Sequence, residues 1–255
     1  MKLDKRVAIV TGAGGGIGRA IALAFIKEGA RVAALDINPV SLRSLETEAD
    51  VGSDRLMIIA SDATVRPSID DAADRIVSAW GRIDILVNNV GGGIGTHSDP
   101  SLIDEGWNAT LSLNLTGCFS FIQAVAGHMR QRNYGRIVNI SSSGGRYRSN
   151  TGASNIAYAA AKGGVLQLTR TVAHALGRDG ITVNAIAPGL VLTPAGVEED
   201  KALEPALRER VLSETPLGYF CDPGEIASIA VFLASYEASY ITGVTILANG
   251  GWCTS

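Results

Sequence analysis

The feature that most constrains the fold is a regular alternation of short apolar runs with longer segments of helical periodicity. Most of the seven runs are near-continuously apolar, a pattern typical of parallel strands that are covered on both faces. After the first run, Ile17, Ile21 and Phe25 share one helical face. The predicted strands are residues 6–12, 31–37, 55–62, 84–90, 135–142, 181–189 and 244–251. This alternation predicts an α/β fold of right-handed βαβ units around a doubly wound parallel sheet.

Nothing in the composition divides the chain into separate units. Its 255 residues are 46% hydrophobic, which is enough for a sizeable core, and no proline- or serine-rich linker interrupts the alternation. We therefore predict a single domain over residues 1–255. Residues 104–130 and 154–178 predict two helices longer than average. Residues 193–220 lack a strand pattern and contain a charged helix-like stretch, which predicts an insertion over one end of the sheet.

Charge and cysteine usage exclude several classes of function. The net charge is −3, and no block of basic residues predicts a nucleic-acid partner. The three cysteines are far apart and no CxxC occurs, while the three histidines lack metal-ligand spacing, so we expect neither disulfides nor a metal site. The apolar run near the N-terminus is too short for a signal peptide. No run approaches the roughly 18 residues of a membrane helix. We therefore expect a cytoplasmic protein with no membrane partner.

The sequence TGAGGGIG at residues 11–18 follows the first predicted strand and opens the first predicted helix. Glycines at such a turn let the backbone bend sharply and approach a ligand closely. The free N–H groups at a helix start then attract a pyrophosphate. The GxGxxG fingerprint does not fit, because Ile17 stands in place of its third glycine, but GxxxGxG fits at Gly12, Gly16 and Gly18. A tight turn without a ligand is the alternative, and the position between strand and helix favours a nucleotide.

Asp36 ends the second predicted strand, 18 residues after Gly18. A carboxylate there accepts hydrogen bonds from the adenosine ribose hydroxyls and would repel a 2′-phosphate. No arginine or lysine lies within the glycine cluster or just after Asp36. The sequence therefore favours NAD over NADP as the cofactor. Capping of the helix that starts near Pro39 is a simpler role for Asp36 and is compatible with cofactor binding.

With these features, the chain resembles the short-chain dehydrogenase/reductase family over nearly its whole length. The family's motifs occur in the family's order and spacing, which together are specific although no single motif is decisive. They are TGAGGGIG at 11–18, Asp36, Asp62, NNVG at 88–91, Asn114, NISS at 139–142, YAAAK at 158–162 and PGLVLT at 188–193. The resemblance implies a single Rossmann-type domain with a seven-stranded parallel sheet. It also implies an oxidoreductase that interconverts a secondary alcohol and a ketone.

The resemblance implies a cofactor site, which we carry over residue by residue. Asp62 and Ala63 would border the adenine, and the segment around Asn88 and Gly91 would line the cleft. The implied cofactor residues are Gly12, Gly15, Gly16, Ile17, Gly18, Asp36, Ile37, Asp62, Ala63, Asn88, Val90, Gly91, Tyr158, Lys162, Pro188, Gly189, Val191 and Thr193. Val90 is a departure, because the family usually has alanine there. The bulkier side chain narrows the pocket, and we expect cofactor binding to survive.

The catalytic residues that the resemblance implies are Asn114, Ser142, Tyr158 and Lys162. Oxidising an alcohol requires a base for its proton, and a nearby cation lowers the pKa of tyrosine from its ordinary value near 10. Tyr158 and Lys162 are four residues apart and would share a helix face. Ser142 would hydrogen-bond the substrate oxygen. Lys162 would also bind the nicotinamide ribose, and Asn114 would hold a water that passes protons to solvent.

The spacing between the catalytic serine and tyrosine is a second departure. Ser142 and Tyr158 are 16 residues apart, which is longer than the family's common spacing. The serines at positions 141 and 143 are therefore alternatives, although Gly145, three residues after Ser142, favours Ser142. The intervening stretch GGRYRSNTGASN is polar and favours a polar small-molecule substrate such as a sugar, a polyol or a hydroxy acid.

The candidate substrate residues are Gly92, Arg146, Arg148 and Asn155. We hypothesise that Arg146 or Arg148 binds a substrate carboxylate, because guanidinium matches that group bidentately. Solvated loop arginines or subunit contacts are the alternative. Residues 193–220 are expected to close over the substrate as a lid.

Two other functions compete with an NAD-dependent alcohol dehydrogenase. One is a 3-oxoacyl thioester reductase of fatty-acid synthesis, a reaction that usually uses NADPH, against which Asp36 argues. The other is a nucleotide-sensing regulator without catalysis, against which the complete catalytic set argues. Family members are commonly homotetramers, so we expect a homotetramer here.

Overall fold

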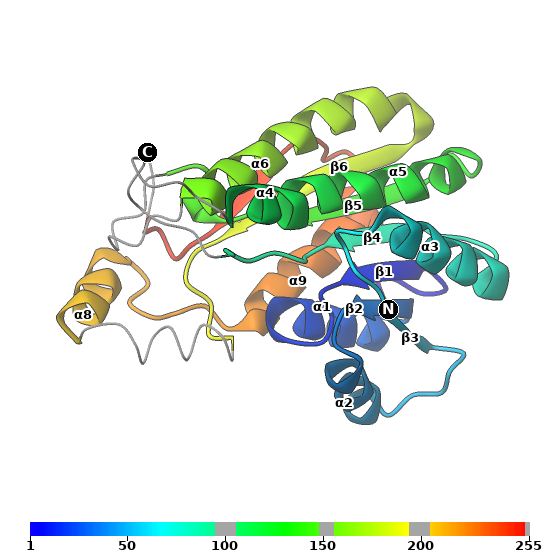
Figure 1. Ribbon diagram of the computed structural model, residues 1–255, viewed down its shortest axis with the longest axis horizontal. Coiled ribbons are helices and arrows are strands. Elements are labelled where there is room, and N and C mark those ends of the chain that lie inside the picture. The colour runs from blue at the N-terminus through cyan, green and yellow to red at the C-terminus, as the bar shows by residue number, and fades with distance from the viewer. Residues whose placement is uncertain (95–105, 148–155, 194–204, 253–255) are drawn as a thin grey trace.

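The computed structural model describes residues 1–94, 106–147, 156–193 and 205–252. Figure 1 shows one sheet with helices on both of its faces. All strand pairs are parallel, and the strand order is β3-β2-β1-β4-β5-β6-β7. Each predicted strand is present, so the predicted fold class is confirmed. The strands are β1 Val7–Thr11, β2 Arg31–Asp36, β3 Leu56–Ala60, β4 Ile85–Asn88, β5 Gly135–Ile140, β6 Ile181–Pro188 and β7 Thr245–Ala248.

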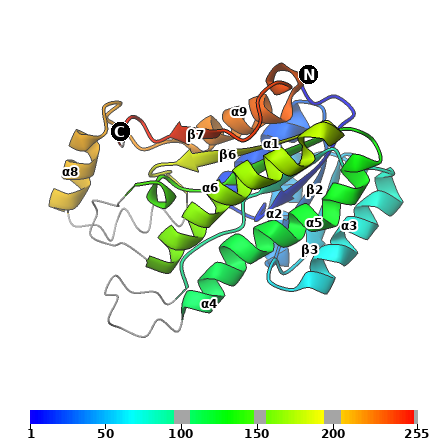
Figure 2. The same cartoon turned by 90° about the horizontal axis from the view of Figure 1, so that it is seen from above.

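The helices form two layers, which Figure 2 shows from above. Helices α1 (Gly16–Lys27), α2 (Pro39–Ala49) and α9 (Pro223–Ala234) cover one face. Helices α3 (Arg66–Trp80), α4 (Gly106–Leu111), α5 (Gly117–Arg130) and α6 (Ile156–Leu176) cover the other. Helix α8 (Pro205–Glu214) stands apart, beyond the carboxyl ends of β6 and β7.

The near-continuous apolar runs arise because both faces of each central strand are buried. In β1, Ala8 and Val10 join the core beneath α1 and α9, whereas Val7 and Ile9 join the core beneath α3 and α5. Successive strand residues point to opposite faces, so both sets must be apolar.

The order in which strands join the sheet reverses at β1, which pairs with β2 on one side and β4 on the other. The connections that leave these strands cover opposite faces, and a crevice opens at their carboxyl ends. Ligands of open α/β sheets bind in such a crevice. Topology therefore brings the glycine cluster, Asp36 and the NNVG stretch to one edge.

The first predicted long helix contains an interruption that the sequence pattern did not predict. Between α4 and α5 lies a π-helical segment, η1 (Ser112–Thr116), which buries Asn114. By length and composition alone, Gly106–Arg130 could cross a membrane. The hydrophobic core buries Phe121, Val125 and Met129 from this stretch, so packing within the fold accounts for its apolar side chains.

The predicted insertion over the sheet lies at 193–220, of which residues 194–204 fall outside the described residues. Its two stems are joined by a parallel bridge between Val191 and Cys221. The Leu192 amide donates to the Cys221 carbonyl at 2.8 Å, and the Cys221 amide donates to the Leu190 carbonyl at 3.0 Å. Trp252 Nε1 also donates to Glu214 at the end of α8. The bridge therefore fixes where the insertion leaves and rejoins the body.

Candidate active site

The glycine cluster forms a tight turn between β1 and α1. Gly12 and Gly16 have φ values of +64° and +51°, which favour glycine. A Cβ on Gly18 would lie 2.2 Å from the Gly12 carbonyl oxygen, so close packing of helix against turn also requires glycine there. A Cβ on Gly15, the N-cap of α1, would meet open space. The predicted GxxxGxG spacing thus has a local structural reason, and the open side of the turn fits a pyrophosphate.

Asp36 turns toward this glycine turn from the end of β2. Its Oδ2 accepts from the Gly14 amide at 2.9 Å, and its Oδ1 accepts from the Asn38 amide at 2.9 Å. Asn38 itself caps α2, accepting from the amides of Val40 and Ser41. Capping of this helix therefore belongs to Asn38. Asp36 keeps its half-buried carboxylate at the crevice, next to the exposed side chain of Ile37.

Arg19 lies at the same corner and was missed in the sequence. Its Nη1 donates to the Gly14 carbonyl at 3.4 Å, and its Nε donates to Glu48 of α2 at 2.7 Å. Ser44, also on α2, accepts from Nη2 at 3.1 Å. The signal was a basic residue directly after the glycine cluster, whose partners come from a helix that only the fold brings near.

The next implied cofactor residues follow β3. Asp62 Oδ1 accepts from the amide and the hydroxyl of Thr64, which orders the turn. Ala63 is buried, and its carbonyl lies 2.6 Å from where a Cβ on Gly117 would stand. Helix α5 therefore packs directly on the segment expected to border the adenine.

A network of hydrogen bonds ties the end of β1 to the end of β4. Thr11 Oγ1 accepts from the amides of Asn89 and Val90 at 2.9 and 3.2 Å, and Asn89 Nδ2 donates to the carbonyls of Thr11 and Gly12. Val90 packs against Gly12, where a Cβ would lie 3.4 Å from Val90 Cγ2. Thr11 and Asn89 were missed as positioning residues, although Thr11 is the first residue of TGAGGGIG and Asn89 the second of NNVG.

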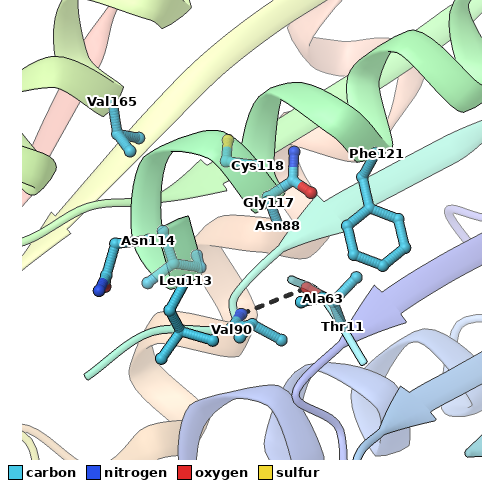
Figure 3. Close-up of a pocket in the computed structure, with 11 residues that line it drawn as sticks. Thr11, Ala63, Asn88, Val90, Leu113, Asn114, Gly117, Cys118, Phe121 and Val165 are labelled. Carbon is cyan, nitrogen blue, oxygen red and sulfur yellow. Dashed lines mark hydrogen bonds between the residues drawn. The ribbon is translucent and has the colours of Figure 1, made fainter. Parts of the chain in front are cut away.

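A small cavity with a mixed apolar and polar lining lies beside this network (Figure 3). Asn88 Nδ2 donates to Asn139 Oδ1 at 2.9 Å, and Asn139 donates onward to Thr169 Oγ1. Asn88 Oδ1 is buried without a hydrogen-bond partner among the described residues. The lining residues are Thr11, Ala63, Asn88, Val90, Leu113, Asn114, Gly117, Cys118, Phe121, Ile140 and Val165. Burial raises the pKa of Cys118 to about 12, so this lining residue stays a neutral thiol.

The structure brings Asn114, Gly91 and Lys162 together. The Asn114 side chain accepts from the Gly92 amide at 3.1 Å and donates to the Gly92 carbonyl at 2.8 Å. A Cβ on Gly91 would lie 2.6 Å from both Asn114 Oδ1 and Lys162 Nζ. Asn114 thus positions the chain after β4, while Gly91 leaves room for the ammonium group. The π-helical turn is the local feature that carries Asn114 into this place.

Lys162 is held at both ends and is only 3% exposed. Its Nζ donates to the Ile140 carbonyl at 3.0 Å, and its own carbonyl accepts from Ser141 Oγ at 2.8 Å. Burial lowers the pKa of Lys162 from its ordinary 10.5 to about 8. The pKa of Lys162 therefore lies closer to neutral pH than that of an ordinary lysine, and its Nζ is held in a fixed position beside the crevice.

The three consecutive serines at positions 141–143 have different surroundings. Ser141 is buried against the Lys162 carbonyl, and Ser143 is buried. Ser142 is half-buried and begins the short helix η2 (Ser143–Gly145), where its Oγ accepts from the Gly144 amide at 3.2 Å. A Cβ on Gly145 would lie 2.6 Å from the Lys162 carbonyl carbon, so η2 packs closely on α6. This geometry favours Ser142 as the hydroxyl available to a substrate.

Tyr158 lies one helical turn before Lys162 on α6, as predicted. The Lys162 Nζ is 5.5 Å from the centroid of the Tyr158 ring. The phenol ring therefore lies beside the buried ammonium group of Lys162.

The PGLVLT stretch closes the opposite side of the crevice. Pro188 ends β6, and the Gly189 amide donates to the Ala248 carbonyl at 2.9 Å. A Cβ on Gly16 would lie 3.0 Å from Thr193 Cγ2, so Thr193 faces the glycine turn. Beyond Leu190, a cavity of about 490 Å³ opens between α8, α9 and the end of β7. Its walls are largely apolar and include Phe220 and Trp252.

The candidate substrate residues are only partly described. Gly92 is held by Asn114 at the crevice. Arg146 is exposed after η2, with its guanidinium 5.3 Å from the centroid of the Tyr147 ring. Arg148 and Asn155 lie outside the described residues.

Comparison with known proteins found related reductases and dehydrogenases. A family model described as enoyl-(acyl carrier protein) reductase matches residues 12–253. The chain is 41% identical to the 3-oxoacyl-[acyl-carrier-protein] reductase FabG of Thermotoga maritima, over 98% of this chain and 99% of that one. It is 39% identical to D-threitol dehydrogenase of Mycolicibacterium smegmatis, over 98% and 94%. The crystal structure of levodione reductase superposes with a TM-score of 0.89 at 31% identity, covering 98% of each chain.

A parallel sheet with a glycine turn at its switch point, together with a Tyr–Lys pair beside the crevice, defines a nicotinamide-dependent oxidoreductase acting on alcohol and keto groups. The chain belongs to the short-chain dehydrogenase/reductase family.

Proposed function

We propose that the chain is an NAD(H)-dependent dehydrogenase that interconverts a polar secondary alcohol and its ketone. The observation that carries the choice of NAD is the Asp36 carboxylate. It lies at the crevice end of β2, anchored to the glycine turn through the Gly14 amide. A carboxylate so placed suits ribose hydroxyls and repels a 2′-phosphate.

Different residues around the crevice would bind different parts of the cofactor. The open N-terminus of α1 at Gly15 suits the pyrophosphate, and Asp36 suits the adenosine ribose. The segments after β4 and β6, which include Gly91 and Thr193, would enclose the nicotinamide end. When bound, the nicotinamide supplies the acceptor or donor of a hydride.

The chain itself handles the proton and the substrate oxygen. Tyr158 takes the hydroxyl proton as the alcohol is oxidised and returns it in the reverse direction. Lys162, protonated below about pH 8, favours the phenolate that this step needs. Ser142 Oγ donates to the substrate oxygen and holds it near the phenol. Asn114 keeps the segment at Gly91 and Gly92 in place beside the ammonium group of Lys162.

A polar substrate is supported by the stretch between Ser142 and Tyr158 and by one relative. Arg146 is exposed at the start of that stretch, where it is able to meet a carboxylate. The relative from Mycolicibacterium smegmatis is named for the polyol D-threitol. We therefore favour a sugar, a polyol or a hydroxy acid as the substrate class.

A 3-oxoacyl thioester reductase is the second candidate, and two observations favour it. Relatives named as 3-oxoacyl-[acyl-carrier-protein] reductases are 36–41% identical to this chain. The apolar cavity beyond Leu190 offers walls that an acyl chain fits. This candidate predicts reduction of 3-oxoacyl thioesters and a preference for NADPH.

A matched substrate and cofactor panel separates the two candidates. Polyols, sugars and hydroxy acids are tested with NAD⁺ and NADP⁺, and 3-oxoacyl thioesters with NADH and NADPH, by nicotinamide absorbance. We expect the highest kcat/KM of the panel for a polar alcohol with NAD⁺. Higher kcat/KM for a thioester with NADPH would establish the second candidate instead. The variant Asp36→Ser should narrow any preference for NAD⁺ by about tenfold or more.

We also propose that the chain forms a homotetramer. Exposed apolar side chains support this on two surfaces, with Trp107 and Phe119 along the Gly106–Arg130 stretch and Tyr240 and Val244 beside the edge strand β7. Light scattering on the purified protein gives the mass directly. A monomeric mass at working concentration would refute the proposal.

A further inference from the structure

A pair of opposite charges stands at the corner that Asp36 marks. Arg19 on α1 and Glu48 on α2 face each other, with Nε and Oε2 2.7 Å apart. The Arg19 side chain is 22% exposed and that of Glu48 is 52% exposed. A surface pair of this kind contributes about 0–1 kcal/mol to folding, so stability alone is a weak reason for it.

The location of Arg19 relative to Asp36 indicates a role for the Arg19–Glu48 pair other than stability. Gly14 accepts from Arg19 through its carbonyl and donates to Asp36 through its amide, so a single residue joins the guanidinium to the carboxylate. Gly14 is also confined, because an added Cβ would lie 2.7 Å from Ser41 Cβ and 2.8 Å from Asp36 Oδ2. Asp36, Gly14 and Arg19 therefore keep a fixed arrangement.

Arg19 has the chemistry to recognise a 2′-phosphate, because guanidinium is always charged and binds phosphate bidentately. In this structure its Nε and Nη2 point to α2 and are taken by Glu48 and Ser44. The negative charge of Glu48 offsets the positive charge of the Arg19 guanidinium. The net charge that remains at the corner is therefore the negative charge of Asp36.

We propose that Glu48 is a specificity-determining residue for the cofactor, acting through Arg19. By neutralising and orienting Arg19, Glu48 withholds a cation that would otherwise attract the 2′-phosphate of NADP. The inference rests on the proposed use of this site by a nicotinamide dinucleotide, and it assigns a role to a residue remote in sequence from the glycine cluster.

The test is direct binding of NAD⁺ and NADP⁺, measured by calorimetric titration of the protein without substrate. The variants are Glu48→Gln, Arg19→Gln and the double variant. Glu46→Gln is the matched control, because Glu46 is an exposed glutamate on the same helix. We expect Glu48→Gln to tighten NADP⁺ binding about fivefold and to leave NAD⁺ binding within about twofold. The gain should vanish in the double variant and shrink at high salt.

The inference would be overturned by equal changes for both dinucleotides, by a gain that persists without Arg19, or by the same gain in Glu46→Gln. The result for wild-type protein is separate. Tighter binding of NADP⁺ than of NAD⁺ by the wild type would refute the proposed cofactor preference. The Arg19-dependence of the Glu48→Gln effect would still decide the inference. If Glu48→Gln lowered thermal stability without changing the affinity for NAD⁺ or NADP⁺, the Arg19–Glu48 pair would serve only to hold α1 against α2, and the inference would be wrong.

Discussion

The two ends of the crevice are built in contrasting ways. At the Tyr158 end, Lys162 is buried, and its Nζ and carbonyl are both hydrogen-bonded within the chain. At the Asp36 end, the charged groups are partly exposed and are held by one another and by backbone amides. Burial makes the first end sensitive to atomic displacement, while exposure leaves the second sensitive mainly to charge.

This difference separates two kinds of requirement. Proton transfer needs groups fixed to a fraction of an ångström and a shifted pKa, both of which burial provides. Choice between two cofactors that differ by one phosphate needs only the right net charge at one corner. Substitutions at the two ends should therefore change different measured quantities, and that expectation can be tested.

Removal of the Tyr158 hydroxyl should have the largest effect. We expect Tyr158→Phe to lower kcat about 10²–10⁴-fold while NAD⁺ binding changes little, because the general acid–base group is lost and the rest of the site remains. The measurement is steady-state kinetics beside calorimetric titration with NAD⁺. Tyr236→Phe, at a 79% exposed tyrosine, is the control. Full activity in Tyr158→Phe would contradict the mechanism and would reopen a regulatory function.

A methyl group at Gly91 should have the next largest effect. Gly91→Ala places Cβ 2.6 Å from Lys162 Nζ and Asn114 Oδ1, so the lysine or the turn must move. We expect kcat to fall roughly 10–100-fold. Gly92→Ala meets open space and should leave the Tm of the cofactor-free protein unchanged. A wild-type kcat in Gly91→Ala would show that activity tolerates a displacement of Lys162, contrary to the expectation that the buried end of the crevice is sensitive to atomic displacement.

Removal of the buried charge should have the smallest effect, and it concerns stability. We expect Lys162→Met to raise the free energy of unfolding of the cofactor-free protein at pH 7 by roughly 1–3 kcal/mol. The folded-state pKa of Lys162 is about 8 and its ordinary value is 10.5. The wild type therefore bears the full cost of the buried charge below pH 8 and loses it as the pH rises toward 10.5.

Denaturant unfolding of both proteins from pH 7 to pH 10.5 checks this prediction. The advantage of Lys162→Met should be constant below pH 8 and should shrink above it. An advantage that grew with pH would show that the lysine is not destabilised by its surroundings.

Several parts of the site were predictable because they depend on local geometry. The strand–glycine–helix pattern predicted the turn at Gly12–Gly18, and the four-residue spacing predicted that Tyr158 and Lys162 lie one helical turn apart. The seven apolar runs predicted the strands within a few residues. These features depend on neighbours in sequence, and the physical rules for them are short-range.

Other parts required contacts between distant segments. The π-helical turn at Asn114 has no sequence period of its own, and it is stabilised where Asn114 meets Gly92. The serine at 141 donates its hydroxyl to the Lys162 carbonyl on α6, a contact that the linear sequence does not indicate. Arg19 acquires its partners from α2, 25 and 29 residues away.

The sequence by itself determined the fold class, the family resemblance and the residue types at the site, because apolar periodicity and motif order are properties of the linear chain. The tertiary structure decided that Ser142 is partly exposed between two buried serines, why Gly91 must be small and how the charge of Arg19 is held. These outcomes depend on burial and on distances of a few ångströms between strands and helices far apart in sequence.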